Sequence, residues 1–122
     1  MDAKRKQLIR EYKETSQPMG VYQIRNTVNG KCLIGTGRNL PGVFNRESFV
    51  LRSGSHRNRL LQDDWNQHGE TAFVFEVLEE LTPLDAPDYN PSEDLAFLEQ
   101  EWLEKIQPFG ERGYNKQKTA AD

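Results

Sequence analysis

Residues 71–79 carry the clearest strand pattern in the chain, and this pattern limits the fold more than any other feature. Inward and outward side chains alternate along TAFVFEVLE with the period of two that a β-strand requires. Residues 20–26 alternate in the same way, and Asn29-Gly30 is a typical hairpin turn because both residues tolerate a positive φ. Residues 31–36 then return as the second strand of the hairpin. The sequence therefore predicts three strands in one antiparallel sheet.

Helical spacing of apolar residues predicts four helices, over residues 3–14, 41–52, 56–68 and 93–106. Ser55 and Ser92 precede the last two, and we expect their side chains to cap these helices. The Pro-rich residues 82–91 are expected to form an exposed loop. The element order α-β-β-α-α-β-α predicts an α+β fold with a three-stranded antiparallel sheet flanked by helices.

The length of 122 residues indicates a single domain over residues 1–122, with an N-terminal helical extension over 1–18 and a flexible tail over 116–122. No apolar run approaches the roughly 20 residues of a membrane helix, and the basic N-terminus does not resemble a secretory signal. Cys32 is the single cysteine and cannot form an internal disulfide. We expect a cytoplasmic protein without a membrane partner.

Charge is strongly segregated along the chain, although the net charge is only −3. Residues 1–62 hold 12 Lys and Arg against 4 Asp and Glu, whereas residues 63–104 hold 13 acids and no Lys or Arg. A folded protein with this asymmetry has a basic side that can attract an anion. Both charged regions are equally compatible with solvated surfaces, so charge alone does not decide the function.

Several short motifs follow one another in a characteristic order. They are Gly20-Val21-Tyr22, Leu33-Ile34-Gly35, Arg38-Asn39-Leu40, Gly54-Ser55-His56-Arg57-Asn58, Leu61-Gln62-Asp63-Asp64-Trp65, His68-Gly69, Phe73-Val74-Phe75 and Tyr114-Asn115. Each motif is weak alone, but the collinear series resembles the GIY-YIG nuclease family, in particular its phage and homing-endonuclease members. The resemblance implies a GIY-YIG-like nuclease domain that hydrolyses DNA phosphodiester bonds with one divalent ion, Mg²⁺ or Mn²⁺.

The resemblance also assigns roles to individual residues. Tyr22 stands at the position of the tyrosine that helps to activate water, Glu99 at that of the metal ligand, and Asn115 at that of the terminal asparagine. Leu33 stands where the family has the tyrosine of its second signature motif, and Val43 stands where the family has its catalytic arginine. Arg46 lies one helical turn beyond Val43, so we expect it to act as the catalytic arginine. Glu47 stands where many members have histidine.

Nucleic acid, DNA rather than RNA, is the partner that the resemblance implies. The residues expected to contact it are Arg38, Arg52, His56, Arg57, Arg59 and Asn115. Each predicted site residue has an alternative reading: Tyr22 as an ordinary sheet aromatic, Glu99 and the arginines as solvated surface residues. Three functions follow: a weak or altered endonuclease, a degenerate nuclease fold that binds nucleic acid, and an interaction domain whose acidic 63–104 segment binds a basic protein.

Overall fold

A computed structural model of the chain describes residues 17–116. The helix expected over 3–14 lies outside these residues, as does all but the first residue of the tail expected over 116–122. No helix within the described range is both long and apolar enough to span a membrane.

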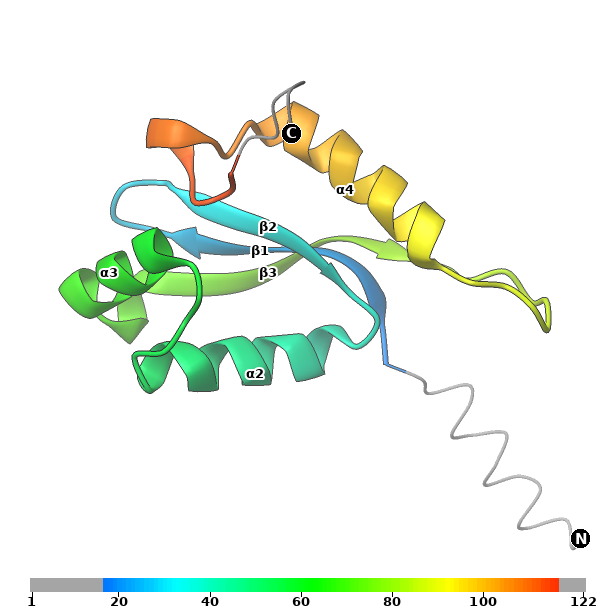
Figure 1. Ribbon diagram of the computed structural model, residues 1–122, viewed down its shortest axis with the longest axis horizontal. Coiled ribbons are helices and arrows are strands. Elements are labelled where there is room, and N and C mark those ends of the chain that lie inside the picture. The colour runs from blue at the N-terminus through cyan, green and yellow to red at the C-terminus, as the bar shows by residue number, and fades with distance from the viewer. Residues whose placement is uncertain (1–16, 117–122) are drawn as a thin grey trace, which may run out of the picture.

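The sheet has three antiparallel strands, as expected from the sequence, and their order is β2-β1-β3 (Figure 1). The strands are β1 (Met19–Asn26), β2 (Cys32–Gly37) and β3 (Phe73–Leu81). The central strand β1 pairs with β2 across the hairpin and with β3, and a bulge shifts the second register between Val21 and Tyr22. The predicted α+β fold with a three-stranded antiparallel sheet is therefore confirmed.

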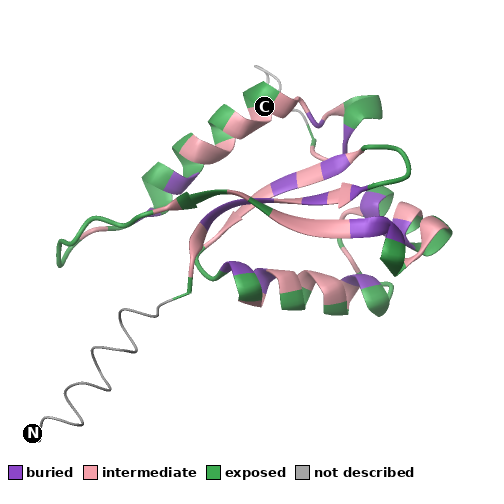
Figure 2. Cartoon of the chain, turned by 180° about the vertical axis from the view of Figure 1, so that it is seen from behind, coloured by how far each residue is buried: buried purple, intermediate pink, exposed green. Residues whose placement is uncertain are grey.

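Helices cover both faces of the sheet. On one face lie α2 (Leu40–Arg52) and α3 (Arg59–His68), and on the other lies α4 (Ser92–Ile106), as Figure 1 shows. Two short 3₁₀ turns, η1 (Glu70–Ala72) and η2 (Gly110–Arg112), complete the described elements. Figure 2 shows that the outer faces of the helices are exposed, while the buried residues gather between helices and sheet.

The alternation of β1 gives the protein two hydrophobic cores, one on each face of the sheet. Tyr22 and Ile24 point towards α2 and α3 and pack with residues such as Leu51, whereas Val21 belongs to the core on the α4 side. Cys32 is buried in this second core, as expected for a small apolar residue rather than a reactive one.

Three local expectations were wrong. Helix α3 begins at Arg59 rather than at 56, because Asn58, not Ser55, caps it by accepting a hydrogen bond from the backbone N–H of Leu61. Ser92 is the first residue of α4 and does not cap it; its hydroxyl accepts a hydrogen bond from Arg38 instead. The apolar residues of 56–68 predicted Leu60 on the buried face beside Leu61 and Trp65, but Leu60 is 62% exposed, because only Leu61 and Trp65, four residues apart, lie on the face of α3 that packs in the core.

The segment after α4 returns along the sheet and completes the structure. Tyr114 is 2% exposed, and its hydroxyl donates a hydrogen bond to Asp64 at 2.7 Å and accepts one from Asn26. Asn115 binds the edge strand β2: its Oδ1 accepts from the backbone N–H of Ile34 at 2.8 Å, and its Nδ2 donates to the carbonyl of the same residue at 2.9 Å. These contacts bring the end of the described chain beside β1 and β2.

Candidate active site

A cavity of about 520 Å³ brings together five of the nine predicted site residues. These are Tyr22, His56, Arg57, Glu99 and Asn115, and they come from β1, the loop before α3, α4 and the C-terminal segment. This cavity is called the central pocket below. Residues separated by more than 90 positions in the sequence thus face one volume, which favours a functional site over scattered surface residues.

Tyr22 reaches the central pocket by crossing Gly35, its partner in β2. A Cβ atom at Gly35 would lie 2.7 Å from the Tyr22 hydroxyl oxygen, so any side chain there would displace the ring. Burial, aided by the negative charge of Glu47, raises the pKa of the Tyr22 hydroxyl to about 12, against the opposing effect of Arg46 and Arg57. The hydroxyl is therefore protonated at neutral pH and can donate a hydrogen bond.

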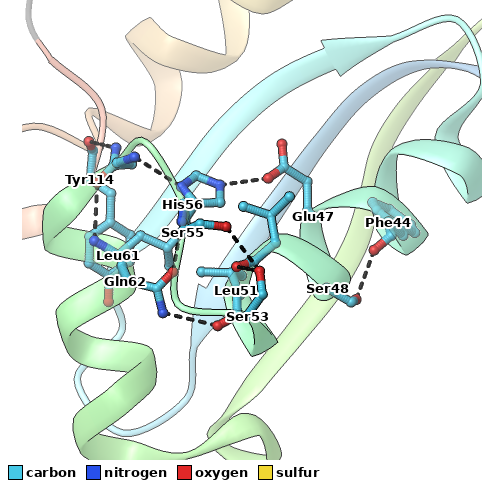
Figure 3. A network of polar contacts seen from close by, with 12 residues as sticks. Phe44, Glu47, Ser48, Leu51, Ser53, Ser55, His56, Leu61, Gln62 and Tyr114 are labelled. Carbon is cyan, nitrogen blue, oxygen red and sulfur yellow. Dashed lines mark hydrogen bonds and ion pairs between the residues drawn. The ribbon is translucent and has the colours of Figure 1, made fainter.

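The loop from residue 53 to 58 is held in a single shape by two polar side chains. Gln62, which is 3% exposed, accepts a hydrogen bond from the backbone N–H of His56 at 2.9 Å and donates one to the carbonyl of Leu51. Asn58 donates through its Nδ2 to the carbonyl of Tyr114 at 2.8 Å. The loop is thereby joined to α2, α3 and the C-terminal segment, and His56 points from it towards Glu47 (Figure 3).

His56 and Glu47 form a buried pair in this wall, facing each other in Figure 3. The distance from Nε2 of His56 to Oε2 of Glu47 is 2.6 Å, and the two side chains are 5% and 13% exposed. Nδ1 of His56 accepts the backbone N–H of Asn58 at 3.0 Å, so the proton of the neutral ring lies on Nε2 and is donated to Glu47. This hydrogen bond lowers the pKa of Glu47 and keeps its carboxylate ionised.

Arg57 and Arg46 contribute positive charge to the site. Within residues 17–116, Arg57 is the one arginine that lines the central pocket. Arg46 is exposed and lines an adjoining cavity of about 470 Å³, which shares Glu47, His56 and Arg57 with the central pocket. The structure thus places the predicted catalytic arginine beside the central pocket rather than in its wall.

The two positions that depart from the family have different environments. Val43 is 7% exposed in the core between α2 and the sheet, and its Cγ2 would lie 2.6 Å from a Cβ at Gly37. Leu33 is half-buried and lines the central pocket. An arginine at Val43 would need space that the core does not have, whereas a larger side chain at Leu33 faces open volume.

The remaining predicted contact residues lie elsewhere or are already engaged. Arg38 donates hydrogen bonds to Asn90 and Ser92 at the start of α4, and Arg52 forms an exposed ion pair with Glu70. Arg59 is exposed at the start of α3 and does not line the central pocket. The arginines predicted to contact nucleic acid are therefore dispersed, and Arg57 is the one of them that lines the central pocket.

Glu99 is half-buried in α4 and lines the central pocket. Within residues 17–116, no group of three or more His, Cys, Asp or Glu side chains is arranged to hold a metal ion. One carboxylate in a polar, water-accessible pocket fits a hard divalent ion that keeps most of its water ligands and takes further oxygens from a phosphate. The donor set thus fits a weakly held Mg²⁺ or Mn²⁺.

Among the charged and carboxamide side chains that line the central pocket, three were not predicted as site residues: Glu47, Asn58 and Lys116. Glu47 was visible as the residue at a family histidine position, but its pairing with His56 depends on the loop between α2 and α3. Asn58 had a local signal, since asparagine is a frequent N-cap. Lys116 had none, because its position depends on the docking of the C-terminal segment.

Comparisons with known proteins give both a sequence relative and structural matches. No protein-family model matches the chain. Over 62 residues, 51% of this chain, the sequence is 36% identical to "Intron-associated endonuclease 1" of Enterobacteria phage T4. The chain spans only 25% of that protein's length.

Two solved structures share the fold. The catalytic domain of the homing endonuclease I-TevI matches 82% of this chain and 99% of its own, with a TM-score of 0.68 and 27% identity. A mutant of the catalytic domain of the intron endonuclease I-TevI matches 81% of this chain and 93% of its own, with a TM-score of 0.68 and 26% identity. Sequence similarity and shared fold together confirm the expected resemblance of the chain to the GIY-YIG nuclease family.

Proposed function

We propose that this domain is an endonuclease that hydrolyses DNA phosphodiester bonds with a divalent cation, Mg²⁺ or Mn²⁺. The observation that carries the proposal is the meeting of Tyr22, Arg57 and Glu99 in one open pocket, although they come from three separate elements. These residues supply a hydroxyl, a cation and a carboxylate, which are the groups that phosphodiester hydrolysis requires. The similarity to an intron endonuclease and to the I-TevI catalytic domain supports DNA as the substrate.

Glu99 is the residue that would hold the ion. When bound, the ion neutralises charge on the phosphate and makes an oxygen nucleophile easier to form at neutral pH. The chain's own residues supply the rest. Arg57, with Arg46 beside it, compensates the negative charge that develops on the phosphate, and the protonated Tyr22 hydroxyl orients the attacking water. Loss of one such stabilising group typically lowers the rate by about 10²–10³-fold.

A plasmid-nicking assay with Mg²⁺ or Mn²⁺ tests the proposal. Glu99→Gln is expected to abolish nicking, and Arg57→Ala and Arg46→Ala to slow it, with circular dichroism as the folding control. Glu101→Gln and Arg112→Ala are the matched controls, since both residues are exposed and lie outside the central pocket. Nicking that survives in a folded Glu99→Gln variant would contradict the metal-binding role of Glu99.

A second candidate function is a nuclease fold that binds DNA without cleaving it. It is favoured by Leu33, which brings no hydroxyl to the central pocket, and by Val43, which is committed to the core. A folded wild-type protein that binds DNA but never nicks it, with either metal, would favour this candidate over the enzyme.

The acidic segment over 63–104 is proposed as the surface for a basic protein partner. Of its acids, Glu79, Glu80 and Glu101 are exposed on β3 and α4 and lie outside the central pocket. Titration with a lysine-rich peptide should shift the NMR signals of these residues at physiological salt. Unchanged signals would remove the partner from consideration without affecting the nuclease proposal.

A further inference from the structure

A second cavity, of about 350 Å³, lies next to the central pocket. The two cavities share Glu99, Asn115 and Lys116, so they form parts of one continuous groove. The lining that belongs to the second cavity alone comes from the end of α4 and the turn behind it: Gln100, Leu103, Glu104, Gln107 and Phe109. We call this volume the flanking cavity. Its size falls within the range of small-molecule sites in proteins.

The lining of the flanking cavity is chemically suited to an aromatic heterocycle with hydrogen-bonding edges. Gln100 and Gln107 each carry a carboxamide that both donates and accepts, and Glu104 accepts only. Gln100 donates through its Nε2 to Oε1 of Glu104 at 3.1 Å and Gln107 donates through its Nε2 to the Glu104 carbonyl at 2.9 Å, so these bonds orient the side chains while the carboxamide oxygens can still accept from a base edge. Glutamine and glutamate are side chains that read base edges in nucleic-acid complexes. Phe109 is half-buried and belongs to neither hydrophobic core, which leaves its ring as a surface on which a base can stack.

The charges of the groove assign different parts of a nucleotide to its two ends. The adjoining cavity beyond His56 contains Arg46 and Arg57 against one carboxylate, that of Glu47. The flanking cavity contains Glu99 and Glu104 against one lysine, Lys116. A phosphate is therefore attracted to the arginine end and repelled from the flanking cavity, whereas a neutral base is not.

Gln107 places a side chain in the flanking cavity from a backbone conformation that usually favours glycine. Gln107 has a φ of 56° and is the one non-glycine residue with a positive φ among residues 17–116. Glycine is the usual residue at such a helix end, because a Cβ atom disfavours the left-handed conformation. The chain instead keeps a carboxamide here, and its Nε2 donates to the carbonyl of Glu104 at 2.9 Å.

We infer that the flanking cavity binds the nucleobase next to the scissile phosphate and so contributes base preference to cleavage. The inference rests on the proposed nuclease function, since it places the phosphate in the central pocket. Gln100, Gln107 and Glu104 contact the base edge, and Phe109 stacks on its face. The nucleotide backbone runs from Glu99 towards Arg57 and Arg46.

NMR titration of the ¹⁵N-labelled protein with the four deoxynucleoside 5′-monophosphates, and with inorganic phosphate, tests this site without requiring cleavage. All five ligands should shift the signals of His56 and Arg57. Only the nucleotides should shift Gln107 and Phe109, and the four bases should differ in affinity by about fivefold or more, the lower end of what one base-edge contact contributes.

Two variants remove the base contacts while preserving the fold. Gln107→Gly places glycine where the backbone has a positive φ, and Phe109→Ala changes a residue outside both cores. Each should abolish the difference between bases and leave the affinity for inorganic phosphate unchanged. Gln67→Ala, an exposed glutamine on α3, is the matched control and should behave as wild type.

The outcomes separate this inference from the proposed function. If nucleotides shift His56 and Arg57 but leave Gln107 and Phe109 unchanged, the base site is refuted and the phosphate site stands. If base-dependent shifts appear at Gln107 and Phe109 but plasmid is never nicked, the base site stands and the endonuclease activity fails. Shifts at Gln107 and Phe109 that inorganic phosphate reproduces, or no shifts with any ligand, would also overturn the base site.

Discussion

Asn115→Ala is expected to destabilise the protein rather than to remove a contact with DNA. Both polar atoms of the Asn115 carboxamide are bonded to the backbone of Ile34, at 2.8 and 2.9 Å. Ile34 is 3% exposed, so the variant leaves one N–H and one carbonyl of β2 partly buried without a partner. Each such group costs about 1–3 kcal/mol. Because the site is only partly buried, we expect a loss of about 2–4 kcal/mol in the free energy of unfolding.

Urea denaturation followed by circular dichroism measures this loss directly, as a lower midpoint with an unchanged slope. Lys116→Ala is the control, since Lys116 is an exposed neighbour that lines the same pocket. An Asn115→Ala variant that keeps its free energy of unfolding within about 0.5 kcal/mol, the usual range for surface substitutions, yet loses DNA binding, would refute the reasoning. Asn115 would then contact the substrate instead of joining the C-terminal segment to β2.

Four further predictions concern the pocket and its surroundings. Leu33→Tyr, which returns a hydroxyl to the central pocket, should fold normally and raise the nicking rate; an unchanged rate in a folded protein would show that this hydroxyl is not what the site lacks. Val43→Arg should instead unfold the domain, because it buries an unpaired charge at a cost of several kcal/mol; a native circular dichroism spectrum would contradict this. Since the hydrogen bond from His56 lowers the pKa of Glu47, its contribution to stability should be complete above the ordinary carboxyl pKa and should fall as the pH drops below it; His56→Ala should remove that part of the acid dependence in urea titrations at pH 3–6. Arg57→Ala should reduce the salt dependence of DNA binding by about 0.9 in the log–log slope, as expected for one lost phosphate contact; an unchanged slope would place Arg57 away from the phosphates.

The strands and most helix boundaries could be predicted because their signals are local. Alternation along β1 and β3 and the Asn29-Gly30 turn need no information from distant residues. The start of α3 could not be predicted in the same way, since Ser55 and Asn58 are both good caps and tertiary contacts decide between them. Asn58 is selected because its side chain also reaches the carbonyl of Tyr114.

The candidate site was predictable only where the family resemblance supplied a position. Tyr22, Glu99 and Asn115 line the central pocket as the resemblance implied, but their roles remain predictions. The arginines expected to contact nucleic acid were grouped by the resemblance and by charge, but the structure disperses them. Arg52, for example, points to Glu70, a partner 18 residues away that no periodicity indicates.

The C-terminal segment determines when, during synthesis of the chain, the central pocket becomes complete. The hydrogen bonds between Ile34 and Asn115 join residues 81 positions apart. The two residues line the same pocket as Tyr22, which the ribosome adds to the chain before either of them. Domains fold during synthesis from the N-terminus onward. The sheet of β1, β2 and β3 can therefore assemble while one wall of the central pocket has not yet been synthesised. A nascent chain that ends before residue 115 can be folded in most of its elements and still lack the complete site, so activity should arise late and abruptly during translation.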